Sequence, residues 1–539
     1  MNQSFDFIVV GGGSAGAVVA ARLSEGAKYS VLLLEAGAPD KSLLIRMPLG
    51  FRLIRQLALF DWGYRSEPEP HANARSIHIP RGKVLGGSSS VNGMIYSRGH
   101  ARDYDEWVRL GAAGWSYDDV LSYFRKSERS DRGASTWHGA DGAMGVSRIS
   151  NDDPLAHAIK QTAVELGYPV VDDFEAGSHE GFGLPDLTVG KGRRSSTASA
   201  FLAPVRDRAN LHVVTGAHAT RILFKGTRAT GVEYRVGEKA FTASCSRETI
   251  LCGGAYGSPH LLMLSGVGPA EHLRRHGISV VADLPGVGTG LQDHPLVPMV
   301  FRSKQPLLVR SATRADRIAW AALRWMLTGK GFLATQPLSS VAYYRSQPSL
   351  ARPDLEFVLI PTSLDAKVWF PGIRPPGADL LSIYNIVLQP ESRGSVRLRS
   401  ANPHEPPAIQ FNLLQSDHDA ELLRHAIGWT RDLMSAGSMQ RFVGEEALPG
   451  RGVEDAAGVK EFIRSAVVTA QHPACTCRMG VDAESVVDPQ LRVHGLQGLR
   501  VADASVMPTL IGGHTNATSI MIGERAADFV RGEIPASMP

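Results

Sequence analysis

The first part of the chain carries two apolar runs separated by a glycine-rich turn, which predicts buried strands joined by a helix. Residues 5–10, FDFIVV, are largely apolar and rich in strand-forming residues, as expected for a strand covered on both faces. After the glycines of residues 11–16, the segment AVVAARLSEGA predicts a helix, and residues 29–34 predict a second buried strand. This order of elements predicts an α/β fold with a parallel sheet.

The middle and later parts of the chain show two further patterns. Short apolar runs at 211–215 and 248–254 predict additional strands of the α/β part. Farther along, the apolar runs at 353–361 and 384–390 are bounded by prolines. This is typical of an antiparallel sheet, because proline cannot donate a hydrogen bond within a sheet and is confined to its margins. We therefore expect a second, α+β part with an antiparallel sheet.

Residues 313–331, TRADRIAWAALRWMLTGKG, predict one helix that places Thr313, Arg317, Arg324 and Thr328 on a single face. The remaining positions of this segment are broadly apolar. The favoured interpretation is a helix that packs on the rest of the protein. The alternative is a contact with a membrane surface or with another subunit.

Composition and charge exclude several classes of protein. With 539 residues, of which 43% are hydrophobic and 20% charged, the chain has enough apolar residues for a large core. The formal net charge is only +4 and no long run of lysine and arginine occurs, so nucleic acid is not expected as a partner. No uninterrupted apolar stretch is long enough for a transmembrane helix.

The N-terminus and the cysteines indicate the compartment. The N-terminus lacks the basic start, apolar middle and cleavage site of a signal peptide. The 4 cysteines are too few for a disulfide framework in a chain of this length. We therefore expect a cytoplasmic protein, with peripheral attachment at the inner membrane as a further option.

Gly11, Gly13 and Gly16 carry the G-x-G-x-x-G spacing between the first predicted strand and its helix, and Glu35 follows the second predicted strand. The first glycine permits a tight turn, the second lets the backbone approach a pyrophosphate, and the third lets helix and strand pack closely. An acid about twenty residues later binds a ribose hydroxyl. The complete pattern predicts a dinucleotide site, for either FAD or NAD.

The segment 471–480, QHPACTCRMG, has the look of a metal site, because His472, Cys475 and Cys477 lie within six residues. A zinc site needs four convergent ligands, and this segment supplies at most three. A disulfide between the two cysteines would close a strained, very small loop. The third interpretation is catalysis by His472 alone, although any one of the 18 histidines of this chain is more often structural than catalytic.

Several separate motifs are similar to those of one enzyme family. Residues 82–105, GKVLGGSSSVNGMIYSRGHARDYD, and 254–268, GAYGSPHLLMLSGVG, resemble the two signatures of the glucose–methanol–choline (GMC) oxidoreductases. The segments 284–294, 499–508 and 514–530 also look like that family, so the resemblance extends along the whole chain. The stretches EPEPHANAR, TWHG and PESRGSVRLRS resemble its bacterial choline-dehydrogenase-like branch, which includes L-sorbose and polyethylene glycol dehydrogenases.

The resemblance implies an architecture of two parts. Residues 1–300 would form a Rossmann-like FAD-binding domain assembled from discontinuous segments, with insertions around 41–80 and 130–200. Residues 301–465 would form a substrate domain whose antiparallel sheet covers the flavin. Residues 466–539 would return to the FAD domain and carry the catalytic residues.

The resemblance also implies which residues contact FAD. Those of the first fingerprint and the first signature are Gly11, Gly13, Ser14, Ala15, Gly16, Glu35, Ala36, Val84, Ser88, Asn92, Gly93, Met94 and Ile95. Those farther along the chain are Ala219, Asp503, Ala504, Thr515 and Asn516. Family members with covalently bound flavin carry a histidine at the position of Val91. Because valine offers no nucleophile, we expect FAD to be bound noncovalently.

Within this resemblance, His472 corresponds to the catalytic base and His514 to its partner, while the two cysteines pack nearby and no metal is bound. A base with a pKa near the working pH accelerates removal of an alcohol proton by about 10²- to 10⁴-fold. A second imidazole can orient the alcohol and stabilise developing negative charge on its oxygen. The cofactor itself supplies the hydride chemistry.

The expected function is FAD-dependent oxidation of a primary alcohol or polyol to the carbonyl, with electrons passed to a quinone-type acceptor. A membrane-surface contact by residues 313–331 would suit such an acceptor. The alternatives are an oxidase of aryl or furan alcohols that reduces O₂ to H₂O₂, an FAD-containing hydroxynitrile lyase, and a non-catalytic redox or metal sensor. The sequence leaves the particular alcohol and the oligomeric state open.

Overall fold

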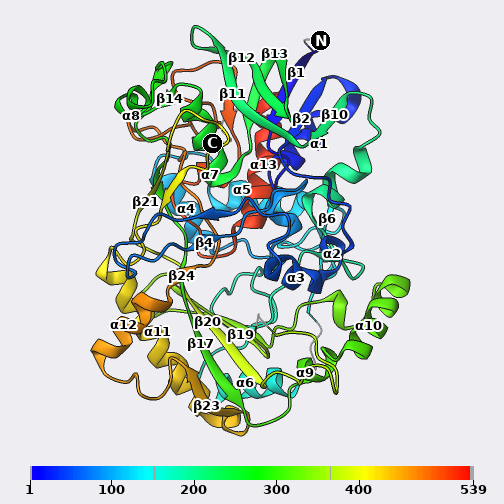
Figure 1. The fold of residues 1–539 in the computed structure, drawn as a ribbon, viewed down its shortest axis with the longest axis vertical. Helices are drawn as coiled ribbons and strands as arrows, with labels where there is room; N and C mark the ends of the chain where they lie inside the picture. Colours follow the sequence, from blue (N-terminus) through cyan, green and yellow to red (C-terminus); the bar gives the residue numbers. More distant parts are fainter. Residues whose placement is uncertain (1–2, 150–152, 364–365, 534–539) are drawn as a thin grey trace.

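A mostly parallel sheet forms one end of the molecule, drawn at the top of Figure 1. The computed structural model describes residues 3–149, 153–363 and 366–533. The parallel strands are β10 (Leu211–Thr215), β2 (Val31–Glu35), β1 (Gln3–Val10), β13 (Lys239–Leu251) and β25 (Leu499–Val501). Two antiparallel strands, β12 (Arg228–Val236) and β11 (Ala217–Lys225), extend the sheet beside β13. The predicted strands near 5–10 and 29–34 are thus confirmed as its central strands.

Helix α1 (Gly16–Leu23) follows β1, as the glycine spacing predicts. A Cβ atom on Gly16 would lie 1.9 Å from the carbonyl oxygen of Gly11, so only glycine allows this close approach of helix and strand. The C-terminal helix α13 (Thr515–Arg531) packs against α1. The chain therefore returns at its end to the sheet with which it begins.

A second sheet, drawn in the lower half of Figure 1, is entirely antiparallel. Its strand order is β23-β17-β20-β19-β18-β7, with β24 beside β17. The strands are β7 (Gly181–Gly183), β17 (Pro295–Ser303), β18 (Ser340–Tyr344), β19 (Leu355–Ile360), β20 (Leu380–Val387), β23 (Val443–Leu448) and β24 (Val468–Thr469). Helices α6 (Pro154–Glu165), α11 (Asp417–Ser435) and α12 (Ala456–Ala466) pack on it. The predicted antiparallel sheet is confirmed.

Shorter elements connect the two sheets. The helices among them are α2 (Leu43–Arg46), α3 (Phe51–Gln56), α4 (Ala101–Arg109), α5 (Tyr117–Ser127), α7 (Gly254–Leu264) and α8 (Ala270–Arg275). Short strands pair as β3 (Tyr64–Arg65) with β4 (His78–Ile79), β5 (Glu128–Ser130) with β6 (Met144–Val146), β8 (Val189–Gly190) with β9 (Arg193–Arg194), and β14 (Val267–Gly268) with β15 (Ala282–Asp283). Strands β16 (Thr289–Leu291), β21 (Gly394–Arg397) and β22 (Ala408–Gln410) form a small sheet.

The segment predicted as one helix over 313–331 forms two helices, α9 (Leu308–Ala312) and α10 (Ala315–Thr328). Thr313 therefore lies outside α10, and its placement on the face of Arg317 and Arg324 was wrong. The chain bends there because the backbone of Arg314 is extended, with φ −66° and ψ 135°, and so separates α9 from α10.

Elements from several parts of the chain contribute to the antiparallel sheet. The predicted boundary between residues 300 and 301 falls inside β17. From the insertion around 130–200, β7 pairs with β18 and α6 packs on the same sheet.

Within the described residues, no helix is both long and apolar enough to cross a membrane.

Candidate active site

A cavity of about 1130 Å³ lies where the two parts of the molecule meet. Residues of the loop that leads into α1 and of the N-terminal ends of α7 and α13 line it, together with residues from the antiparallel sheet. The sequence-predicted residues in its wall are Gly11, Gly13, Ser14, Ala15, Glu35, Ala36, Ser88, Asn92, Gly93, Met94, Ile95, Ala219, His472, Asp503, Ala504, His514, Thr515 and Asn516. One cavity thus collects residues from nearly the whole length of the chain.

Two of the residues predicted to contact FAD do not line the cavity. Gly16 lies behind the wall, where it packs α1 against Gly11. The side chain of Val84 is fully buried in a small apolar cluster with Ile45 and Ile54. A contact from Val84 to a cofactor would therefore have to come from its backbone.

Two helix N-termini meet at the wall of the cavity. Neither α1 nor α13 has a side-chain cap on its first backbone N–H groups. The Ser14 hydroxyl donates to Asn516 Oδ1 at 2.9 Å and so joins the two helix ends. A Cβ atom on Gly13 would have no neighbour nearer than 3.9 Å, so the backbone there is open to the cavity. Uncapped helix N-termini favour anions, and the site therefore fits the pyrophosphate of FAD.

Glu35 ends β2 with a buried carboxylate that already has two partners. Its oxygens accept hydrogen bonds from the backbone N–H groups of Gly12, at 2.9 Å, and Gly37, at 2.6 Å. Burial raises the pKa of Glu35 to about 7, and these two hydrogen bonds oppose the rise. Because each carboxylate oxygen can accept a second hydrogen bond, the predicted role toward a ribose hydroxyl is compatible with this geometry.

Asp503 holds the start of α7 in place. Its Oδ2 accepts hydrogen bonds from the Gly254 N–H at 2.9 Å and from the Ser258 hydroxyl at 2.5 Å. Its Oδ1 accepts from the Ser505 N–H at 2.8 Å. Desolvation raises the pKa of this buried carboxyl. Asp503 thus fixes the wall of the cavity at which the C-terminal segment and α7 meet.

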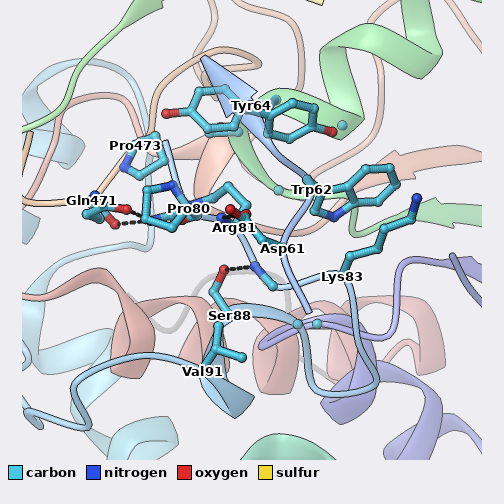
Figure 2. Close-up of a pocket in the computed structure, with 18 of the residues that line it drawn as sticks. Asp61, Trp62, Tyr64, Pro80, Arg81, Lys83, Ser88, Val91, Gln471 and Pro473 are labelled. Carbon is cyan, nitrogen blue, oxygen red and sulfur yellow. Dashed lines mark hydrogen bonds between the residues drawn. The ribbon is translucent and has the colours of Figure 1, made fainter. Parts of the chain in front are cut away.

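The loop of the first signature forms another part of the wall. Figure 2 shows Ser88 and Val91 beside each other there, with the Ser88 hydroxyl accepting from the Gly82 N–H at 3.2 Å. Asn92 Oδ1 accepts from Arg194 at 2.7 Å and from the Met94 N–H at 3.1 Å. These bonds fix the backbone of the loop against the cavity.

The loop around His472 is shaped by residues from other segments. The backbone N–H of His472 donates to Asp293 Oδ1 at 2.8 Å, and Arg81 donates to the Gln471 carbonyl at 2.7 Å, as Figure 2 shows for the latter pair. Gln471 and Cys475 both have positive φ, 71° and 76°. Such backbone conformations are uncommon for residues other than glycine and need support from surrounding contacts.

His294 bonds His472 on one side and the protein backbone on the other. The Nδ1 atoms of the two imidazoles lie 3.0 Å apart, and His294 Nε2 lies 3.0 Å from the Ile511 carbonyl oxygen. A carbonyl only accepts, so His294 carries its proton on Nε2. Burial lowers the pKa of His294 to about 4, which leaves its Nδ1 unprotonated and able only to accept. His472 must then donate from Nδ1, and its Nε2 keeps a lone pair.

The pKa of His472 lies well below its ordinary range. Burial is the main cause, and the neighbouring His514, His294 and Arg81 act in the same direction. His472 is therefore neutral near pH 7. A neutral imidazole with its Nε2 lone pair available can take a proton.

His514 lies next to His472, with the ring centroids 4.5 Å apart. His514 Nε2 is 3.0 Å from Glu356 Oε1, and the Glu356 side chain is completely buried in β19. The carboxylate accepts from Nε2, so only Nδ1 of His514 is left for another partner. The structure thus brings the two predicted catalytic histidines together and gives each a different partner.

Neither His294 nor Glu356 was singled out from the sequence. Glu356 offered a signal, because it is the one charged residue within the apolar strand 355–360. A buried acid in such a strand is costly unless it has a partner. His294 lies in the segment 284–294, but nothing in its spacing from His472 predicted a contact across 178 positions.

The cysteines of the 471–480 segment lie in the core. Cys475 and Cys477 are buried and form no disulfide. Burial raises the pKa of both thiols above the ordinary value. Among the residues that the structure describes, no group of three histidine, cysteine or acidic side chains is arranged to hold a metal ion.

The antiparallel sheet supplies an apolar wall of the cavity. Leu296 of β17 faces Ile386 of β20, and Val358 of β19 faces Tyr384 of β20. All four residues line the cavity. Glu356, which binds His514, lies on the same strand as Val358 and two residues before it. Successive residues of a strand point to opposite faces, so Glu356 and Val358 share the face toward the cavity.

The fold and the cavity together define a dinucleotide-binding protein of Rossmann type with an added antiparallel sheet. The chain belongs to the GMC oxidoreductase family, since residues 5–296 match the N-terminal family model and residues 390–523 the C-terminal one. It is therefore an FAD-dependent oxidoreductase, as the sequence motifs predicted.

Relatives and solved structures agree with this assignment. The chain is 42% identical to the oxygen-dependent choline dehydrogenase of Brucella suis biovar 1, over 98% of this chain and 96% of that protein. Its structure is similar to that of pyridoxine 4-oxidase from Mesorbium loti, with a TM-score of 0.85, 31% identity, and coverage of 97% and 98% of the two chains. It is also similar to formate oxidase from Aspergillus oryzae, with a TM-score of 0.91, 28% identity and 99% coverage of both chains.

We predict that acid precipitation of the purified protein will release its FAD into the supernatant. Val91 lines the cavity at the position where the family resemblance implies a histidine in members with covalent flavin, and its isopropyl group cannot bond to the flavin. The measurement is the flavin absorbance of the supernatant and of the washed pellet. Flavin that stays with the pellet would show that another residue forms a covalent bond.

Proposed function

We propose that the protein oxidises a primary alcohol or polyol to the carbonyl compound and passes the electrons to a quinone-type acceptor. The observation that carries this proposal is the His472 imidazole, which is buried in the cavity wall with its Nε2 lone pair available. The choline dehydrogenase name of the relatives supports an alcohol as the substrate.

In this proposal, FAD supplies the hydride acceptor when it is bound. Gly11, Gly13 and the N-terminus of α1 would hold its pyrophosphate, and Asp503 keeps the neighbouring end of α7 in position. The carbon chain of the alcohol lies against the apolar wall formed by the antiparallel sheet. Its hydroxyl lies beside the adjacent rings of His472 and His514.

His472 Nε2 accepts the hydroxyl proton while the α-carbon loses its hydride and the C=O bond forms. The low pKa of His472 keeps Nε2 unprotonated before the reaction, at the cost of a weaker base. Burial away from water compensates, because a hydrogen bond to a developing alkoxide is stronger in a low dielectric. His514 contacts the alcohol hydroxyl from Nδ1, and the Glu356 carboxylate fixes the orientation of its ring through Nε2.

Anaerobic mixing of the holoenzyme with a panel of alcohols tests this proposal. We expect primary alcohols or polyols to bleach the oxidised flavin absorbance, and the aldehyde product to form in equal amount. A hydroxynitrile lyase or a sensor would leave the flavin oxidised with every alcohol.

The same experiment then separates a dehydrogenase from an oxidase. We expect the reduced enzyme to be reoxidised faster by a soluble quinone or dye than by air-saturated buffer, measured by stopped flow. The oxidase neighbours, pyridoxine 4-oxidase and formate oxidase, make O₂ the alternative acceptor. Reoxidation by O₂ as fast as turnover with the dye would assign the protein to the oxidases.

A further inference from the structure

Helix α10 has two apolar faces, and only one of them packs on the protein. Ile318, Ala321, Ala322 and Trp325 recur at the spacing of one helix face and pack against an apolar cluster that includes Leu49. Trp325 is the one fully covered side chain of the helix. The inward face thus accounts for the attachment of the helix.

The opposite face of α10 is apolar and exposed. Trp320, Leu323 and Leu327 recur at i, i+3 and i+7, and Met326 lies beside them. Trp320 is 66% exposed and Leu327 is 76% exposed. A surface helix normally turns polar residues to water, so this outward face indicates a contact with something outside the chain.

A neighbouring loop extends the exposed apolar area. The Ala315 N–H donates to the Trp369 carbonyl, and the Trp369 indole N–H donates to the Arg310 carbonyl at 2.8 Å. These bonds hold the loop beside the junction of α9 and α10. The exposed apolar residues of α9 and of this loop are Leu308, Val368, Phe370 and Ile373. Together with the outward face of α10 they form the α10 patch, and Figure 1 shows helix α10 itself at the outer edge of the molecule.

The charges around the α10 patch are predominantly positive. The basic residues of segments 308–330 and 366–379 are Arg310, Arg314, Arg317, Arg324, Lys330, Lys367 and Arg374, against the acidic Asp316 and Asp379. Arg314 pairs with Asp316 and Arg310 with Asp379, each at 2.6 Å. The other five basic side chains form no ion pair within the described residues.

We infer that the α10 patch docks the enzyme on an anionic phospholipid surface. Apolar and indole side chains enter the boundary of headgroups and acyl chains, while arginine and lysine beside them bind anionic headgroups. A second copy of the chain fits less well, because facing patches would bring five unpaired cations against five others. The proposal is independent of which alcohol the enzyme oxidises.

The position of the patch connects it with the active site. Phe51 packs in the apolar cluster beneath α10 and also lines the active-site cavity. A membrane at the α10 patch would therefore lie one helix away from the wall of the cavity. An apolar alcohol or a quinone dissolved in the lipid would have a short path to the enzyme.

Co-sedimentation of the holoenzyme with lipid vesicles tests this inference. We expect binding to vesicles that contain phosphatidylglycerol, weaker binding to pure phosphatidylcholine, and loss of the difference at high salt. The double variant Trp320→Ser, Leu327→Ser should lower the partition coefficient by about tenfold or more. Arg317→Glu with Arg324→Glu should weaken binding to the anionic vesicles alone.

Val481→Ser is the matched control, because Val481 is 74% exposed but lies outside the α10 patch. It should bind vesicles like the wild type, and all of these variants should keep the wild-type rate of flavin reduction. Failure of the wild type to bind anionic vesicles, or unchanged binding by the double variant, would overturn the inference. So would a wild-type dimer that the double variant converts to a monomer in light-scattering measurements, since that result would assign the patch to self-association.

Discussion

Replacing His472 with alanine should lower the rate constant of anaerobic flavin reduction by about 10²- to 10⁴-fold, the usual contribution of a general base. The reason is the Nε2 lone pair of His472, which is available to accept the alcohol proton. Among the described residues that line the cavity, no other base lies in an equivalent position beside His514. FAD should remain bound, because the pyrophosphate site at α1 does not involve His472. The measurement is stopped-flow reduction with the alcohol that serves wild type best.

Two controls separate loss of the base from damage to the fold. His425→Ala makes the same change on the exposed face of α11 and should leave reduction unaffected. Added imidazole should restore part of the activity of His472→Ala, because the deleted ring leaves space in the cavity wall. If His472→Ala reduces at nearly the wild-type rate while His514→Ala does not, the base is His514.

The pH dependence of the same reaction reports on His472 directly. Its pKa is lowered below the ordinary 6.5 by burial and by three nearby cationic or imidazole groups. As the pH falls through 6.5, the reduction rate of the wild type should therefore stay constant. It should fall only when the pH approaches the lowered pKa of His472. A fall in rate centred at pH 6.5 would mean that bound ligands restore an ordinary pKa to His472.

The sequence predicted the dinucleotide site because its determinants are local. Gly11, Gly13 and Gly16 lie on a continuous strand-turn-helix unit, and their spacing alone requires close approach of backbone to backbone. Helix α10 was also visible as an apolar segment. Its start at Ala315 was not, because the hydrogen bonds that separate it from α9 involve a turn and the distant Trp369.

The environment of the two predicted catalytic histidines could not be inferred from local sequence pattern. His472 and His514 were paired only through resemblance to a family. The partner of His514, Glu356, lies in β19, and the partner of His472, His294, directly precedes β17. The long-range backbone pairing of Gln292 with Ala474 brings His294 close to His472. Register between distant segments depends on the whole core, so a single sequence leaves such contacts unspecified.

The second large effect is expected at His294, which positions His472 and makes no predicted contact with the alcohol. His294→Leu removes the acceptor for His472 Nδ1–H, so the proton can move to Nε2 and block the base. Losing a buried hydrogen bond of this kind costs about 1–3 kcal/mol, which corresponds to about five- to 150-fold in the rate of flavin reduction. Stopped-flow reduction across a range of alcohol concentrations separates this rate from substrate binding.

His294→Gln is the matched variant for this test, because its amide offers both a donor for the Ile511 carbonyl and an acceptor for His472. If His294 acts through the tautomer of His472, the leucine variant should lose its limiting reduction rate with little change in the alcohol dependence, and glutamine should restore most of that rate. A purely structural role predicts that both variants lose FAD or unfold at lower temperature together. Equal loss of rate in the two variants, with FAD retained in both, would show that the tautomer of His472 does not depend on His294.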